Sequence, residues 1–157
     1  MKYVAFLRGI LPGNPNMRNE KLRVVFEDLG FKNVQTVISS GNVLFEDGKE
    51  NIQKLQEKIE KALDKKLGLS KTTTIIRSFD QLQKLIKSDP FKGKEHGSSS
   101  YLNVTFLKKG GEVFNAVDLS DATTPQLMSK LEKSHGKEIT TRTWKTVNRV
   151  FTKLSKE

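Results

Sequence analysis

The residues best suited to binding a ligand are two polar groups that lie at the ends of apolar segments. Arg8 and Gly9 close an apolar segment near the start of the chain, and Ser39, Ser40 and Asn42 lie at the start of another. An arginine, two hydroxyl groups and an amide are groups that bind phosphates and other anions. If the fold brings these segment ends together, they form a site for a small anionic or phosphorylated ligand.

The spacing of apolar residues predicts the elements that would position this site. In the first half of the chain it predicts strands at 2–8, 34–38, 42–46 and 72–77, and helices at 19–29 and 51–67. This order is that of the ferredoxin-like split βαβ unit. In that unit the third strand lies between the first and the second, so the polar residues and the helix start near Asn19 share one sheet edge. The first strand is apolar on both faces and is expected to be central.

The second half of the chain shows a similar order of elements. We expect helices at 80–87, 124–135 and 142–153, and strands at 101–107, 113–117 and 137–141. The order helix, strand, strand, helix, strand therefore occurs twice. The sequence predicts an α+β protein of two fused ferredoxin-like halves, residues 1–78 and 79–157, with antiparallel sheets and packed helices.

Turn chemistry offers a second interpretation of the same polar residues. Ser39 and Ser40, followed by a glycine, suit a short hairpin connection, which Asn42 would cap. Arg8 would then pair with a surface carboxylate. Both interpretations remain open at the level of sequence.

The last predicted helix carries a second basic feature. At 100° per residue, one narrow stripe holds the basic residues Arg142, Lys145, Arg149, Lys153 and Lys156. The opposite face is apolar and is expected to enter the core, with Trp144, Val147, Phe151 and Leu154. The basic stripe suggests nonspecific nucleic-acid binding as an alternative function, whereas a solvated charged face is the ordinary role of such a stripe.

Composition limits the remaining possibilities. The chain has 28 basic and 18 acidic residues, a net charge of +10, which favours anionic ligands. It has no cysteine, which excludes disulfides and thiolate metal sites. Its two histidines, His96 and His135, have no metal-ligand spacing, so no metal or cofactor is expected. No general acid, base or nucleophile can be assigned, and an enzymatic activity is neither predicted nor excluded.

No apolar run approaches the ~20 residues that a membrane-spanning helix needs, so no membrane partner is expected. The sequence begins directly with a strand pattern and without a leader-like segment. On these grounds the expected location is the cytoplasm.

Four segments together resemble a known family. Residues 3–10, 40–45, 89–91 and 140–147 are similar in type and order to motifs of DUF1697, a family of small, mostly bacterial proteins of unknown function. The resemblance implies a ferredoxin-like α+β fold in two related halves, and no known activity, cofactor or catalytic residue. Members often follow Arg-Gly-Ile with Asn-Val-Gly-Gly, whereas this chain has Leu11-Pro12-Gly13-Asn14. A ligand contact made by that loop in relatives is therefore not carried over to this chain.

Overall fold

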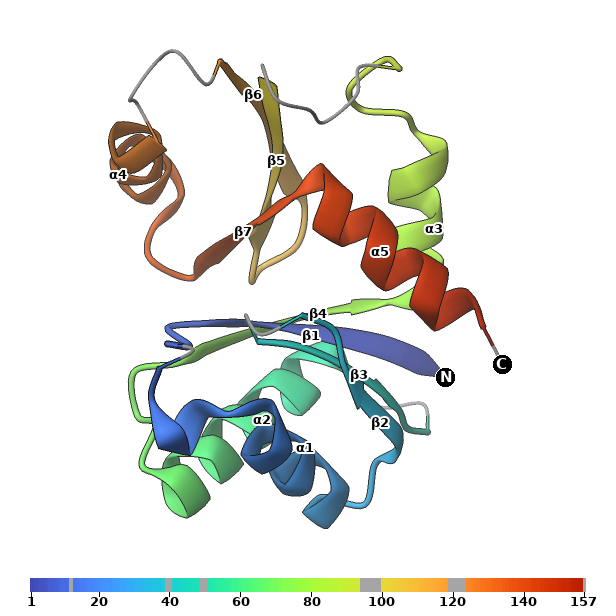
Figure 1. Cartoon of the computed structure of the whole chain (residues 1–157), viewed down its shortest axis with the longest axis vertical. Coiled ribbons are helices and arrows are strands. Elements are labelled where there is room, and N and C mark those ends of the chain that lie inside the picture. The colour runs from blue at the N-terminus through green and yellow to red at the C-terminus, as the bar shows by residue number, and fades with distance from the viewer. Residues whose placement is uncertain (12, 39–40, 49–50, 94–99, 119–123, 157) are drawn as a thin grey trace.

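Two antiparallel sheets lie one above the other in the computed structural model, with helices on both sides of the first sheet (Figure 1). The structure describes residues 1–157 except 12, 39–40, 49–50, 94–99, 119–123 and 157. The described elements are five α-helices, one short 3-10 turn and seven strands, which confirms the predicted α+β class.

The first sheet has the strand order that the sequence predicts. Its elements are β1 (Lys2–Arg8), α1 (Asn19–Asp28), β2 (Lys32–Thr36), β3 (Asn42–Glu46), α2 (Ile52–Leu67) and β4 (Thr73–Ser78), with the 3-10 turn η1 (Pro15–Met17) before α1. The strands are ordered β2-β3-β1-β4, and each neighbouring pair is antiparallel. β3 therefore lies between β1 and β2, as expected.

The second sheet is built differently. It follows α3 (Phe79–Lys87) and contains β5 (Ser100–Leu107), β6 (Glu112–Asp118) and β7 (Ile139–Thr143), with α4 (Thr124–His135) before β7 and α5 (Trp144–Ser155) after it. Its described strands are ordered β6-β5-β7. This order does not repeat that of the first sheet, so the prediction of two ferredoxin-like halves is not confirmed. The division at residues 78 and 79 stays a prediction.

Local sequence signals explain where several helices begin and end. Asn51 caps α2 by accepting from the Gln53 amide at 2.8 Å, and Gly68 ends that helix in the left-handed conformation, with φ of 68°. Ser78 and Gln81 form a reciprocal capping box at the start of α3. At the start of α1 the cap position is held by Arg18, which makes no side-chain cap hydrogen bond, and the side-chain amide of Asn19 donates to the carbonyl of Ile38 at 3.0 Å.

β1 is buried on both faces, as its sequence predicts. Tyr3, Ala5 and Leu7 pack against α1 and α2 on one side of the first sheet. Val4 and Phe6 face the other side, where α3, α5 and β5 pack. There the rings of Phe6 and Phe106 stack at 4.3 Å between centroids and join the two sheets through apolar contact.

The two edges of the first sheet differ. The β4 edge is closed by side chains of α2, because Gln56 accepts from the Ile76 amide at 3.0 Å and Glu60 accepts from the Thr74 amide at 2.7 Å. At the other edge, β2 pairs with β3 alone among the described strands. Its register shifts between Lys32 and Gln35, which marks an irregularity that weakens a strand edge for further pairing.

The turn before β3 provides a test of how closely the chain is packed there. A Cβ on Gly41 would lie 2.8 Å from the side chain of Ile10, whereas nothing lies within 4 Å of a Cβ on Gly30. Both residues have a positive φ, 76° and 90°. We expect Gly41→Ala to lower the free energy of unfolding by ~1–3 kcal/mol more than Gly30→Ala does, because only Gly41 is also crowded. Urea unfolding of both variants measures this difference, and equal losses would contradict the packing described here.

Candidate functional site

The structure brings the two predicted segment ends together. Phe6 pairs with Asn42 across β1 and β3, and the Leu7 amide donates to the carbonyl of Gly41 at 2.8 Å. The end of β1 and the start of β3 are therefore neighbours, as the sequence predicts. Ser39 and Ser40, which belong to the same predicted site, lie outside the described residues.

One residue of the predicted anion site, Asn42, contacts a cation of the protein itself. Asn42 is 1% exposed, and its side-chain amide donates to the carbonyl of Val37 at 3.0 Å. Its oxygen accepts from Nε of Arg142 at 2.7 Å. The same guanidinium donates to the carbonyl of Leu7 at 2.9 Å. Carbonyl and amide oxygens thus converge on a guanidinium, which is the arrangement for a bound cation.

The surroundings of Arg142 hold it firmly within the interface between the sheets. Its Nη1 donates to the hydroxyl of Thr140 at 2.6 Å and to the carbonyl of Thr141 at 3.0 Å. The guanidinium carbon lies 5.5 Å from the centre of the Phe6 ring. Burial lowers the pKa of Arg142 to about 10, which still leaves the group charged at neutral pH.

Arg8 also has partners in the second half of the chain. It forms an ion pair with Glu132 of α4 and donates to the carbonyls of Lys137 at 2.7 Å and Ile139 at 3.2 Å. This pairing with a carboxylate is the second interpretation raised by the sequence. Gly9 lies beside it in a left-handed conformation with φ of 90°. The predicted site is thus part of the contact between the two sheets.

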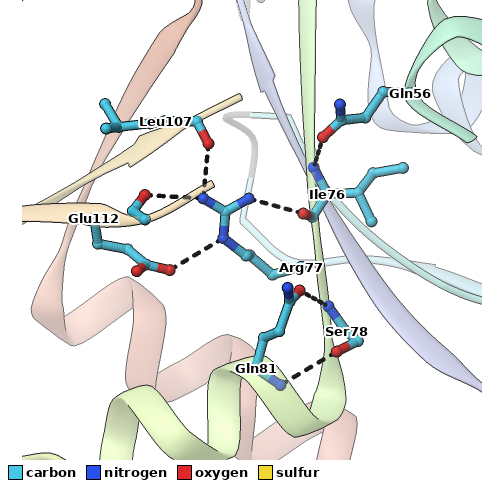
Figure 2. Close-up of polar contacts among 8 residues, drawn as sticks. Gln56, Ile76, Arg77, Ser78, Gln81, Leu107 and Glu112 are labelled. Carbon is cyan, nitrogen blue, oxygen red and sulfur yellow. Dashed lines mark hydrogen bonds and ion pairs between the residues drawn. The ribbon is translucent and has the colours of Figure 1, made fainter. Parts of the chain in front are cut away.

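A second arginine crosses the same interface in the opposite direction (Figure 2). Arg77 of β4 is 3% exposed, and it donates to Glu112 at 3.0 Å and to the carbonyls of Leu107 at 2.8 Å and Gly111 at 3.0 Å. Its guanidinium carbon lies 5.5 Å from the centre of the Phe106 ring. Sequence analysis missed this residue, although a single arginine after the apolar pair Ile75-Ile76 was a possible signal.

One placement from the sequence is wrong. Arg142 is expected on the basic stripe of the last helix, but it lies on β7, because α5 begins only at Trp144. Thr143 caps that helix by accepting from the Thr146 amide at 3.2 Å. The β-branched threonines at 140, 141 and 143, on both sides of Arg142, favour a strand, which explains the later start of the helix. The apolar face of α5 packs in the core as expected, through Val147, Val150 and Leu154.

The other residues of the basic stripe line a groove. The groove lies between α5 and the end of β2 and has a volume of about 1020 Å³. On the helix side it is lined by Lys145, Asn148, Arg149, Thr152, Lys153 and Lys156, and on the strand side by residues 35–38. No acidic residue is among these lining residues. We call this feature the basic groove.

The cations of the basic groove differ from the arginines of the interface. Lys145 and Arg149 are exposed and, within the described part of the chain, form no ion pair. Lys153 is also exposed and makes one long contact, from its ammonium to the carbonyl of Thr36 at 3.5 Å. These charges remain available to a ligand.

Other kinds of site find no support in the described residues. They contain no cluster of three histidine or acidic side chains able to hold a metal ion. His135 ends α4, where a basic residue suits the helix dipole, and His96 lies outside the described residues. None of the helices described is both long and apolar enough to cross a membrane.

Comparison with known proteins places the chain in a family. A model of DUF1697, described as a protein of unknown function, matches residues 1–139. The chain belongs to the DUF1697 family. The match ends at the first residue of β7, so Arg142 and α5 lie beyond it.

A solved structure shares the fold of this DUF1697 protein. It is a conserved bacterial protein, SP0830, from Streptococcus pneumoniae, with a TM-score of 0.73 and 19% sequence identity over 98% of each chain. At this identity the similarity establishes the arrangement of elements, including α5, and not a function. No curated protein matches the chain.

The contact between Asn42 and Arg142 can be measured by a double-mutant cycle. We expect Asn42→Ala to cost ~1–3 kcal/mol, because it leaves a buried guanidinium N–H without an acceptor. Arg142→Met should cost ~3–5 kcal/mol, because several buried carbonyls lose their donor. The double variant should be less unstable than the sum by at least ~0.5 kcal/mol. Urea unfolding measures all three, and additive losses would contradict a direct contact.

Proposed function

We propose that this protein binds an anionic, phosphorylated ligand in the basic groove. The observation that carries the proposal is the line of four cations, Lys145, Arg149, Lys153 and Lys156, in a groove without an acidic lining residue. Cations concentrated along one wall attract anions from solution. The net charge of +10 acts in the same direction.

The site first predicted from sequence is the competing location. That site centres on Arg8, Ser40 and Asn42, with Gly9 and Ser39 beside them. Arg8 donates to Glu132, and the Asn42 side-chain amide donates to the carbonyl of Val37, so the donors that an anion would need there are already in use. Binding there would require these internal contacts to break, whereas binding in the basic groove requires no such rearrangement. The contacts therefore favour the basic groove.

The groove suits binding more readily than catalysis. Its lining residues include no histidine and no carboxylate, which are the usual groups for proton transfer. Lysine and arginine side chains donate charge-assisted hydrogen bonds to phosphate oxygens. Threonine and asparagine side chains on the same helix face add neutral donors. A ligand held in this way would be bound and left unchanged.

Inorganic tripolyphosphate provides a direct test. It should raise the melting temperature of the protein at low ionic strength, because a ligand that binds the folded state stabilises it. The variant Lys145→Gln/Arg149→Gln/Lys153→Gln should bind tripolyphosphate at least ~10-fold more weakly, since each exposed contact contributes ~0.5–1 kcal/mol. Thermal shift and isothermal titration calorimetry measure both effects.

Two control variants locate the site. Lys54→Gln/Lys61→Gln/Lys65→Gln removes the same charge from exposed positions of α2, on the far side of the first sheet (Figure 1). This α2 variant should keep most of the affinity for tripolyphosphate. Arg8→Gln should also keep the affinity while lowering stability. If Arg8→Gln abolishes binding without unfolding the protein, and the α5 variant binds normally, the site lies at the β1 edge and this proposal is wrong.

A further inference from the structure

We infer that the ligand of the basic groove is a chain of phosphate groups, held by its backbone and without recognition of bases. Nucleic acid and inorganic polyphosphate share this chemistry. The inference rests on the proposed function and narrows it from any phosphorylated ligand to a linear polyanion.

The spacing of the cations fits a chain of phosphates better than a single phosphate group. Lys145, Arg149 and Lys153 follow one another at intervals of four residues, or ~6 Å along the helix axis. From Lys145 to Lys156 the charged line extends over twelve residues, or ~16 Å. One phosphate group can contact only neighbouring members of such a line. A chain with a charge at every unit can contact all of them together.

The size of the groove also favours a chain over a small phosphorylated molecule. Its volume of about 1020 Å³ lies at the upper end for a pocket that encloses a small molecule. The basic residues that line it are exposed rather than enclosed. A small phosphorylated metabolite would leave most of the groove empty, whereas a chain would run along it and continue at both ends.

The types of lining residue show which part of a nucleic acid would be recognised. Proteins that hold single-stranded bases stack them on aromatic side chains. No aromatic residue lines the basic groove, and the apolar lining residues are Val37 and Ile38. Trp144, the aromatic residue nearest the start of α5, packs against Phe91 at 5.3 Å instead. Recognition would therefore involve phosphates and be independent of base sequence.

An acidic protein segment is the other polyanion to consider, and the structure disfavours it. Such a segment would gain affinity by adding a strand to the free edge of β2. That edge is short and irregular, with a register shift after Lys32 and a positive φ of 52° at Asn33. The carbonyl of Thr36 already accepts from Lys153. These features discourage strand addition, whereas a phosphate chain needs only the cations.

The test is the salt dependence of oligonucleotide binding, measured by fluorescence anisotropy. Labelled 20-nucleotide single strands and a 20-base-pair duplex of mixed sequence serve as probes. Contacts with three or four phosphates predict that affinity falls roughly 20- to 150-fold between 50 and 200 mM salt. The affinities for oligo-dA and oligo-dT should agree within about threefold, because bases are not read.

Variants connect this dependence to the groove. The triple α5 variant should flatten the slope of log affinity against log salt by ~2–3, since it removes three phosphate contacts. The triple α2 variant should leave the slope unchanged. Retained affinity and slope in the α5 variant would overturn the inference, because the chain would then bind elsewhere.

Competition distinguishes the remaining outcomes. Inorganic polyphosphate should displace the oligonucleotide, and polyglutamate of equal charge should do so much less well. Equal displacement by polyglutamate would overturn the inference in favour of an acidic protein segment. If tripolyphosphate binds in the groove but a 20-nucleotide strand gains less than about tenfold over it, the proposed function stands and the chain inference fails. If neither binds, both fail.

Discussion

The structure depends on hydrogen bonds that two arginines make between the sheets, each arginine reaching from its own sheet to the other. Arg77 reaches from the first sheet to the β5–β6 turn, and Arg142 reaches from the second sheet to the ends of β1 and β3. Between them lie the stacked rings of Phe6 and Phe106. A buried guanidinium is costly unless its donors are satisfied, and here carbonyl oxygens at strand ends and turns satisfy them.

The same interaction sets the geometry of the basic groove. Arg142 fixes the end of β7 against Asn42, and α5 begins two residues later at Trp144. The apolar face of α5 packs on the core shared by the two sheets, which leaves its basic face beside the end of β2. The position of the groove is therefore a consequence of the interface, although neither of the two interface arginines lines it. The interface arginines are held by internal hydrogen bonds, whereas the cations of the groove are exposed.

The sequence predicts the elements of the first sheet and which of its strands are neighbours. The apolar pattern of β1 and the order of elements correctly place β3 between β1 and β2 and bring Asn42 next to the end of β1. The partners of Arg8 and Asn42 were beyond prediction, because Glu132 lies 124 residues after Arg8 and Arg142 lies 100 residues after Asn42. The start of α5 was misplaced because Arg142 continues the basic stripe at helical spacing. The family match adds no information there, since it ends at residue 139.

Binding of a phosphate chain in the basic groove is tested most directly by mapping where such a chain touches the protein. Backbone amide chemical shifts can be followed by NMR while inorganic polyphosphate is titrated into the labelled protein. The largest changes should fall on residues 35–38 and on the exposed face of α5, with small changes at Leu7, Arg8 and Asn42. Changes concentrated at the end of β1 and the start of β3, with α5 unaffected, would contradict binding in the basic groove.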